Sequence, residues 1–145
     1  MAETASERIR IDASPQRCYE VAVDFERYPD WAQDVKQVTV LERDADNRGA
    51  RVEYRAAALG RSTRYVLEYD YGEAPAAFSW QLVEGDMLRQ LDGRYGFEPD
   101  GGGTRVSYKL TADPSIPLPG FIKRRAASKI IGTALKELKR EAERA

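Results

Sequence analysis

The chain has 145 residues, of which 42% are hydrophobic and 32% charged, and this composition predicts one folded domain over residues 1–145. Without histidine and with a single cysteine, the sequence excludes intrachain disulfides and imidazole-based triads, so we expect neither a metal nor a cofactor. The net charge of −1 is uneven, because residues 117–145 hold eight Lys and Arg against three Asp and Glu.

This basic C-terminal segment has two interpretations. It either complements an acidic body or offers a surface to anionic lipid headgroups. Nucleic acid is not expected, because the basic residues are not interleaved with aromatic ones and no nucleic-acid motif is present. No apolar run reaches the ~20 residues of a membrane span, and the N-terminus lacks a secretion signal. We expect a soluble, cytoplasmic protein.

The first elements are a strand and a helix. Ile9 and Ile11 alternate with arginines in SERIRIDAS, which predicts a half-buried strand. Ser14-Pro15 is typical of a helix start, since serine caps the helix and proline fits its first position. Cys18 falls on the apolar face of this helix, where we expect a buried, structural thiol.

The stretch DFERYPDWAQ, residues 24–33, follows the first helix. Pro29 ends that helix and can begin a second short one over roughly residues 29–34. Trp31 lies on this second helix, and its indole either plugs the end of a cavity or anchors the corner by packing. The charged side chains around it are interpreted as solvated faces and caps rather than catalytic carboxylates.

Alternating segments separated by short turns then predict six strands of an antiparallel meander. Turn residues fall at Asp46–Gly49, Leu59–Gly60, Gly72–Pro75, Gly85–Asp86 and Pro99–Gly103. The predicted strands span residues 35–43, 51–58, 61–71, 77–84, 87–98 and 104–112.

One face of these strands is rich in aromatic side chains. They are Tyr54, Tyr65, Tyr69, Trp80, Tyr95, Phe97 and Tyr108. A dry core favours aliphatic residues, because a buried phenol needs a hydrogen-bond partner, so this face indicates a cavity for an amphipathic ligand. Gly93 and Gly96 permit bending or close approach. Arg89 alternates in step with the inward-facing residues of its strand. Its side chain either anchors a polar group of the ligand or lies at the solvent end of the strand.

The last element is a helix of about 25 residues after the proline-rich crossing at 113–120, with an apolar stripe that would close over the sheet. Ala127, Ile131 and Ala134 lie on this stripe, and the two alanines leave room for a ligand. Phe121, at the start of the helix, is a further candidate ligand contact. The predicted fold is α+β, a seven-stranded curved antiparallel sheet wrapped around a long C-terminal helix, with two short helices between strands 1 and 2.

Three segments together resemble a known family: DFERYPDW…VKQVTVLE, GTRVSYKL after a glycine loop, and PLPGFIKRR…ALKELKRE. They are similar to the START-like (SRPBCC) superfamily, in the bacterial polyketide cyclase/dehydrase and lipid-transport group with its coenzyme Q-binding-protein-like members. The resemblance covers essentially the whole chain and implies the helix-grip fold with a deep cavity for a hydrophobic or amphipathic small molecule. It carries over no catalytic residue.

Two functions remain open at this point. The first is binding or transport of a lipid, quinone or polyketide-like molecule without chemistry, with transient membrane-surface contact through Lys123, Arg124 and Arg125 during loading. The second is a polyketide aromatase/cyclase or dehydratase-like enzyme, in which arginine and tyrosine side chains stabilise an enolate and transfer protons.

Overall fold

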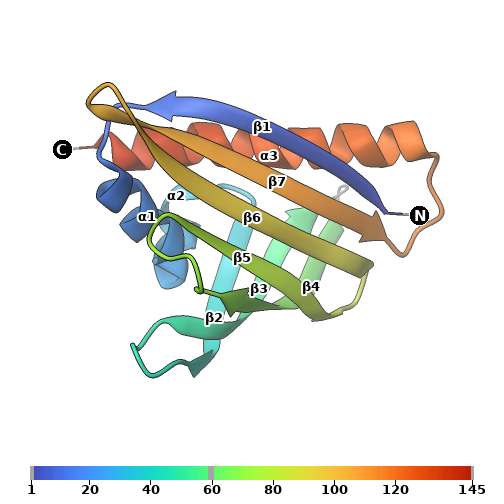
Figure 1. Ribbon diagram of the computed structural model, residues 1–145. Helices are drawn as coiled ribbons and strands as arrows, with labels where there is room; N and C mark the ends of the chain where they lie inside the picture. The colour runs from blue at the N-terminus through green and yellow to red at the C-terminus, as the bar shows by residue number, and fades with distance from the viewer. Residues whose placement is uncertain (1, 59–60, 145) are drawn as a thin grey trace.

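The computed structural model describes residues 2–58 and 61–144 and follows the predicted order of elements (Figure 1). The predicted turn at Leu59–Gly60 lies outside the described residues. The elements are β1 Glu3–Ile11, α1 Pro15–Val23, η1 Phe25–Arg27, α2 Tyr28–Trp31, β2 Val35–Arg43, β3 Gly49–Ala58, β4 Arg61–Asp70, β5 Ala77–Gly85, β6 Leu88–Asp100, β7 Gly103–Pro114 and α3 Gly120–Ala142.

The seven strands form one antiparallel sheet in the order β1-β7-β6-β5-β4-β3-β2, which confirms the predicted meander. The first strand pairs with the last, and Ile9 lies opposite Val106. Figure 1 shows the sheet curving around α3, which runs along β1 and β7, while α1 and α2 lie at the end of the sheet where α3 finishes. The helix-grip fold class predicted from the sequence is therefore correct.

The helical corner between β1 and β2 follows local rules. The Ser14 hydroxyl accepts a hydrogen bond from the Arg17 amide at 3.1 Å, as expected for an N-cap before Pro15. The second helix is shorter than predicted: it begins at Tyr28, and Ala32 is already extended, with φ −99° and ψ 98°. The helix therefore ends three residues earlier than the sequence suggested.

The core forms where the inner face of α3 meets the sheet. Ile131 and Leu138 have no exposed surface, and Leu135 is 3% exposed. Cys18 is fully buried on the inner face of α1, and this burial raises the pKa of its thiol. The cysteine is thus packed as the sequence predicted, in a setting that keeps it protonated and unreactive.

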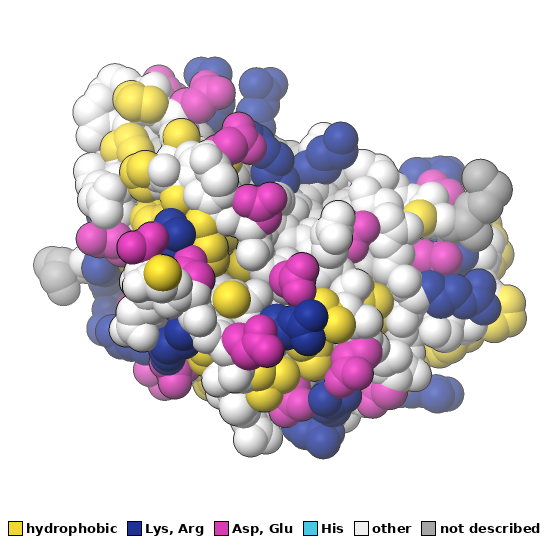
Figure 2. Space-filling view, turned by 60° about the horizontal axis from the view of Figure 1, so that its bottom comes forward, with side chains coloured by type: hydrophobic (Ala, Val, Ile, Leu, Met, Phe, Trp, Pro, Cys, Tyr) yellow, Lys and Arg dark blue, Asp and Glu magenta, His cyan; other side chains and the backbone are white. Residues whose placement is uncertain are grey.

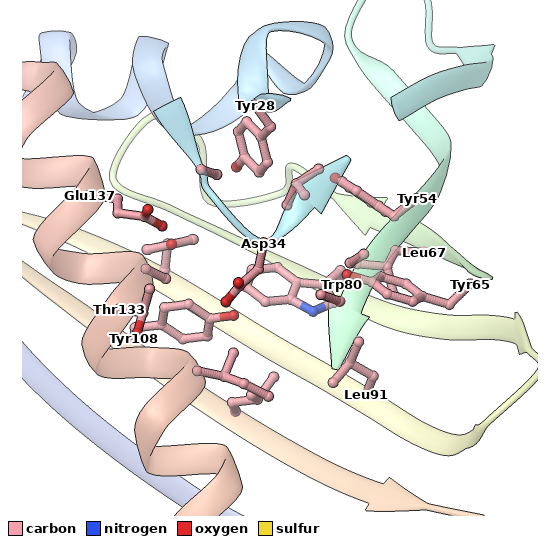
Figure 3. A pocket seen from close by; sticks show the side chains of 18 of the residues that line it. Tyr28, Asp34, Tyr54, Tyr65, Leu67, Trp80, Leu91, Tyr108, Thr133 and Glu137 are labelled. Carbon is pink, nitrogen blue, oxygen red and sulfur yellow. The ribbon is translucent and has the colours of Figure 1, made fainter. Parts of the chain in front are cut away.

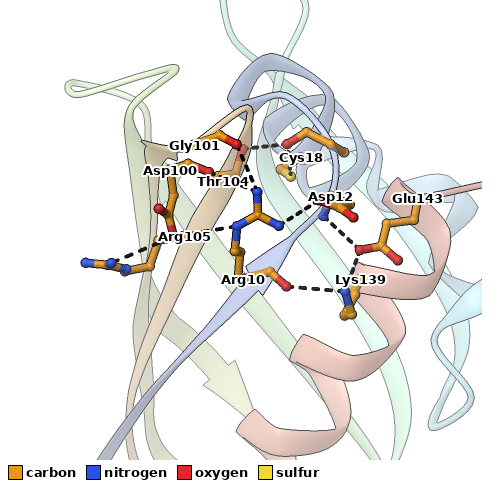
Figure 4. A network of polar contacts seen from close by, with 10 residues as sticks. Arg10, Asp12, Cys18, Asp100, Gly101, Thr104, Arg105, Lys139 and Glu143 are labelled. Atoms are coloured by element: carbon orange, nitrogen blue, oxygen red, sulfur yellow. Dashed lines mark hydrogen bonds and ion pairs between the residues drawn. The ribbon is translucent and has the colours of Figure 1, made fainter.

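A polar network joins the end of β1 to the end of α3 (Figure 4). Arg10 donates to the Asp12 carboxylate at 2.6 Å and to the carbonyl of Asp100 at 3.1 Å, in the β6–β7 connection. The Asp12 amide donates to Glu143 at 2.8 Å, and Lys139 donates to the same carboxylate at 2.5 Å. One arginine and one glutamate thus hold three segments that are distant in sequence.

The outer surface carries charges of both signs. Figure 2 shows Lys and Arg side chains interspersed with Asp and Glu, with hydrophobic side chains between them. Some of these charges pair across strands, as where Arg64 contacts Glu53 at 2.7 Å and Glu84 at 2.9 Å. Such exposed pairs contribute little stability, ~0–1 kcal/mol each, so the fold depends mainly on its apolar inner face.

Candidate functional site

A cavity of about 180 Å³ lies between the inner face of the sheet and α3, next to the corner that holds α2 (Figure 3). Side chains from β3, β4, β5, β6 and β7 form its sheet wall, and Ile130, Thr133, Ala134 and Glu137 of α3 form the opposite wall. Its lining is mostly apolar, as in small-molecule sites generally.

Aromatic rings in mutual contact make up the sheet wall. The Tyr54 and Tyr65 rings stack with centroids 5.3 Å apart, and Trp80 meets Tyr108 edge to face at 5.6 Å. Gly93 makes this packing feasible, because a Cβ at that position would lie 2.2 Å from the Trp80 indole. The close approach predicted for Gly93 is thus the contact that seats the tryptophan.

The hydroxyl groups on this wall fall into two kinds. Tyr54 and Tyr69 satisfy each other with a hydroxyl–hydroxyl distance of 2.5 Å. Within the described residues, the hydroxyls of Tyr65, Tyr95 and Tyr108 have no hydrogen-bond partner. Every fully covered side-chain nitrogen or oxygen in that part of the chain does have one, so these three hydroxyls open onto the cavity. They are therefore available to a ligand.

Burial controls the protonation of these phenols. It raises the pKa of Tyr65 to about 12 and the pKa of Tyr108 well above its usual value. Burial also raises the pKa of Tyr95, with a smaller contribution from the nearby Glu137 carboxylate. All three tyrosines are consequently neutral at physiological pH and act as hydrogen-bond donors and acceptors.

Two carboxylates face the same space (Figure 3). Glu137 is 8% exposed, and one of its oxygens accepts a hydrogen bond from the Gln33 amide at 3.0 Å. Asp34, the residue after Gln33, is exposed at the rim. Among the described residues, no group of three or more metal-ligating side chains comes together.

A second hollow of about 300 Å³ continues the cavity toward the N-terminal half of α3. The two spaces share Asp34, Thr63, Leu88, Leu91 and Thr133 among their lining residues, so they are neighbouring parts of one recess. Lys123 lines the second hollow, where it donates to Asp113 at 2.9 Å in a buried ion pair. The polar character of the recess therefore changes along its length.

The structure brings most of the predicted site residues to the cavity. Tyr54, Tyr65, Tyr69, Trp80, Tyr95, Tyr108 and Ala134 all line it. Ala127 lines the second hollow instead, and Ile131 is buried in the core beside the cavity without lining it. Trp31 lines the cavity, and its ring also packs against that of Tyr28 with centroids 4.9 Å apart.

Three predicted contacts lie elsewhere. Arg89 is exposed and its guanidinium is 3.5 Å from the Ser115 carbonyl, because a register shift between Leu88 and Gln90 reverses the alternation of β6. Phe97 is buried 6.1 Å from the ring of Tyr19, under α1. Phe121 is 57% exposed at the start of α3.

Sequence reasoning missed several polar lining residues, above all Asp34, Thr133 and Glu137. Glu137 follows Ala134 by three residues and Thr133 by four, which places it on the same helical face. That spacing was the available signal. It was obscured because a glutamate at the edge of an apolar stripe is usually solvated.

Comparison with known proteins agrees with this geometry. The family model described as polyketide cyclase/dehydrase and lipid transport matches residues 2–143. The chain belongs to this family. A search of curated proteins finds no match. None of the described helices is long and apolar enough to cross a membrane.

Several solved structures share the fold. A START superfamily protein from Mycobacterium smegmatis aligns with a TM-score of 0.92 at 23% identity, over 97% of both chains. A protein from Thermus thermophilus aligns with a TM-score of 0.80 at 27% identity, also over 97% of both chains. The Zhui aromatase/cyclase from Streptomyces sp. R1128 aligns with a TM-score of 0.85 at 15% identity, over 99% of this chain and 95% of the cyclase chain.

Proposed function

We propose that this family member binds or carries a hydrophobic or amphipathic small molecule in the cavity between the sheet and α3. One observation carries the proposal: the cavity wall is aromatic, yet three of its tyrosine hydroxyls have no partner within the described residues. A solid core would leave such groups at a cost of ~1–3 kcal/mol each, whereas a bound ligand satisfies them.

The size of the recess constrains the ligand. Drug-sized ligands occupy pockets of ≈ 300–1,000 Å³, so the cavity of about 180 Å³ alone suits a small ring system. A longer ligand would extend into the second hollow toward Lys123. Apolar burial would supply affinity at ~25 cal/mol per Å² of surface removed from water.

A cavity-filling substitution tests the proposal. Native mass spectrometry of the freshly purified protein, and titration with a hydrophobic fluorescent probe, should both reveal bound small molecules. Ala134→Phe places a ring in the cavity and should abolish probe binding, whereas Ser128→Phe, on the exposed face of the same helix, should leave it intact. Equal probe binding by both variants would rule out this cavity as the site.

An aromatase/cyclase or dehydratase-like enzyme is the second candidate, and the Glu137 carboxylate favours it. This buried group faces neutral tyrosine hydroxyls across the cavity, an arrangement suited to proton transfer. Incubation with a short poly-β-ketone probe, followed by absorbance, should then show turnover that Glu137→Gln removes while probe binding persists. Absence of turnover in the wild type would leave binding as the function.

We also propose transient contact with an anionic membrane surface, and a cytoplasmic location. Phe121 is exposed at the start of α3, and Arg125, one helical turn later, is exposed as well. Lys123 contributes little to such a surface because it is paired with Asp113, and Arg124 bonds Glu3 at 2.7 Å. Phe121→Ala should weaken co-sedimentation with phosphatidylglycerol vesicles; unchanged co-sedimentation would count against contact through this residue.

A further inference from the structure

The charged side chains that line the cavity within the described residues are all acidic. Asp34 and Glu137 are the charged side chains among the described residues that line it, and neither lysine nor arginine is present there. Lys123 and Lys129 line the second hollow instead. Lys36 donates to the Gln33 carbonyl at 2.9 Å but is not among the residues that line the cavity. A ligand that fills the cavity therefore meets negative charge without a compensating cation.

The buried carboxylate has capacity left for a ligand. Glu137 uses one oxygen to accept the Gln33 hydrogen bond, and its other oxygen has no partner among the described residues. An ionised carboxylate offers about four acceptor positions on its two oxygens. A buried charge is costly unless it is paired, so an N–H or O–H donor on the ligand would stabilise Glu137.

Aromatic rings surround this acidic end. Tyr28 and Trp31 come from α2, while Trp80, Tyr95 and Tyr108 come from the sheet. The negative faces of aromatic rings attract cations within about 6 Å of a ring centroid, and tryptophan does so best. Rings combined with carboxylates match a positively charged ligand that also has an apolar body.

Two hydroxyls give an independent indication of a polar ligand group. Tyr95 is 6% exposed and Tyr108 is 8% exposed, both line the cavity, and neither hydroxyl has a hydrogen-bond partner within the described residues. Their rings lie 4.4 Å apart, and they come from the paired strands β6 and β7 of the sheet wall. A hydroxyl oxygen can accept from an ammonium N–H, so these groups would complete its coordination.

We propose that the cavity takes an apolar amine in its protonated form, with the ammonium group held by Glu137 and Asp34 and the apolar body packed on the aromatic wall. The inference rests on the proposed binding function and specifies its ligand class. A neutral alcohol would donate one hydrogen bond to Glu137 but gain no charge pairing. A carboxylate of the same shape would be repelled, since nothing basic among the described residues lines the cavity.

Three probes of one shape test the ligand class: 2-naphthylmethylamine, 2-naphthylmethanol and 2-naphthoic acid, titrated calorimetrically at about pH 7. We expect the amine to bind about tenfold or more tightly than the alcohol, and the acid not to bind measurably. Equal affinities, or tightest binding of the acid, would overturn the amine proposal while the binding function stands. Failure of all three probes to bind would overturn both.

Substitutions test which residues cause the preference for the amine probe. Glu137→Gln preserves the acceptor for the Gln33 amide and removes the charge, so the amine should lose its advantage while the alcohol binds within about threefold of its wild-type affinity. Glu98→Gln removes a charge from an exposed position of β6 and should leave the amine preference intact. Asp34→Asn, at the rim, provides a second variant should Glu137→Gln fold poorly. An amine preference that survives in the folded Glu137→Gln or Asp34→Asn protein would refute the assignment.

Discussion

Gly93→Ala is the substitution that tests the cavity wall most directly. A methyl group at this position would lie 2.2 Å from Cζ2 and 2.6 Å from Cε2 of Trp80. Carbon atoms pack at ≈ 3.5–4.0 Å, so the indole must move by at least about 1 Å. The strand itself has little freedom, because Gly93 is paired with Leu110 of β7 and with Trp80 of β5.

The expected loss of stability in Gly93→Ala follows from overpacking of the interior. Extra methyl groups in a packed interior cost ~1–3 kcal/mol, and Tm falls by ~2–4 °C per kcal/mol in a domain of this size. We expect Tm to fall by about 2–12 °C. Because Trp80 lines the cavity, it can relieve the clash only by entering that space, so affinity for a hydrophobic probe should fall as well.

Urea unfolding followed by tryptophan fluorescence measures the stability, and probe titration measures the affinity. Gly132→Ala is the matched control: a Cβ there lies 3.7 Å from Glu7, and alanine should stabilise the interior of α3 by ~0.5–1 kcal/mol. The reasoning would be refuted by a Gly93→Ala protein with wild-type stability and wild-type near-ultraviolet circular dichroism.

Three further predictions concern the core, the first helix and the tyrosines. Ile131→Ala should cost ~2–5 kcal/mol in urea unfolding, since the side chain is fully buried; a loss under about 1 kcal/mol would mean that the site collapses to fill the gap. Ser14→Ala should cost ~1 kcal/mol through loss of the cap on Arg17, with Ser14→Gly milder, and equal stability of all three proteins would contradict the cap. The pKa of Tyr65 is raised to about 12 in the fold, so its contribution to stability is complete below the ordinary pKa near 10 and is lost as pH rises through 12. Absorbance at about 295 nm during alkaline titration should show this tyrosine ionising late, and ionisation near pH 10 would contradict its burial.

Alternation along the strands predicted the aromatic wall because each strand is half-buried, so parity alone decides which side chains face inward. Tyr54, Tyr65 and Tyr108 show this directly. Alternation predicted that the Arg89 side chain faces inward, whereas it is exposed. The register shift between Leu88 and Gln90 causes the difference, and it depends on pairing with β7 rather than on local sequence. A one-residue offset of this kind is not visible in the pattern of a single strand.

Two other outcomes depended on tertiary packing. Phe97 shares the inward parity but lies where α1 covers the sheet, so Tyr19 occupies the space that a ligand would need. Glu137 became a cavity residue because the chain leaves α2 early and places the Gln33 amide against its carboxylate. Neither relationship is encoded within one element, which is why the fold could be predicted more fully than the site.

The pairing of β1 with β7 also affects how the protein is made. Residues 12–103 separate the paired Ile11 and Thr104, which corresponds to roughly 5–20 s of synthesis at ≈ 5–20 residues per second. During that interval β1 emerges from the ribosome without its partner strand, and α3, which packs against β1, emerges only after β7. Non-local pairing of this kind slows folding. The nascent chain must therefore keep its N-terminal strand from mispairing until the C-terminal helix has been translated.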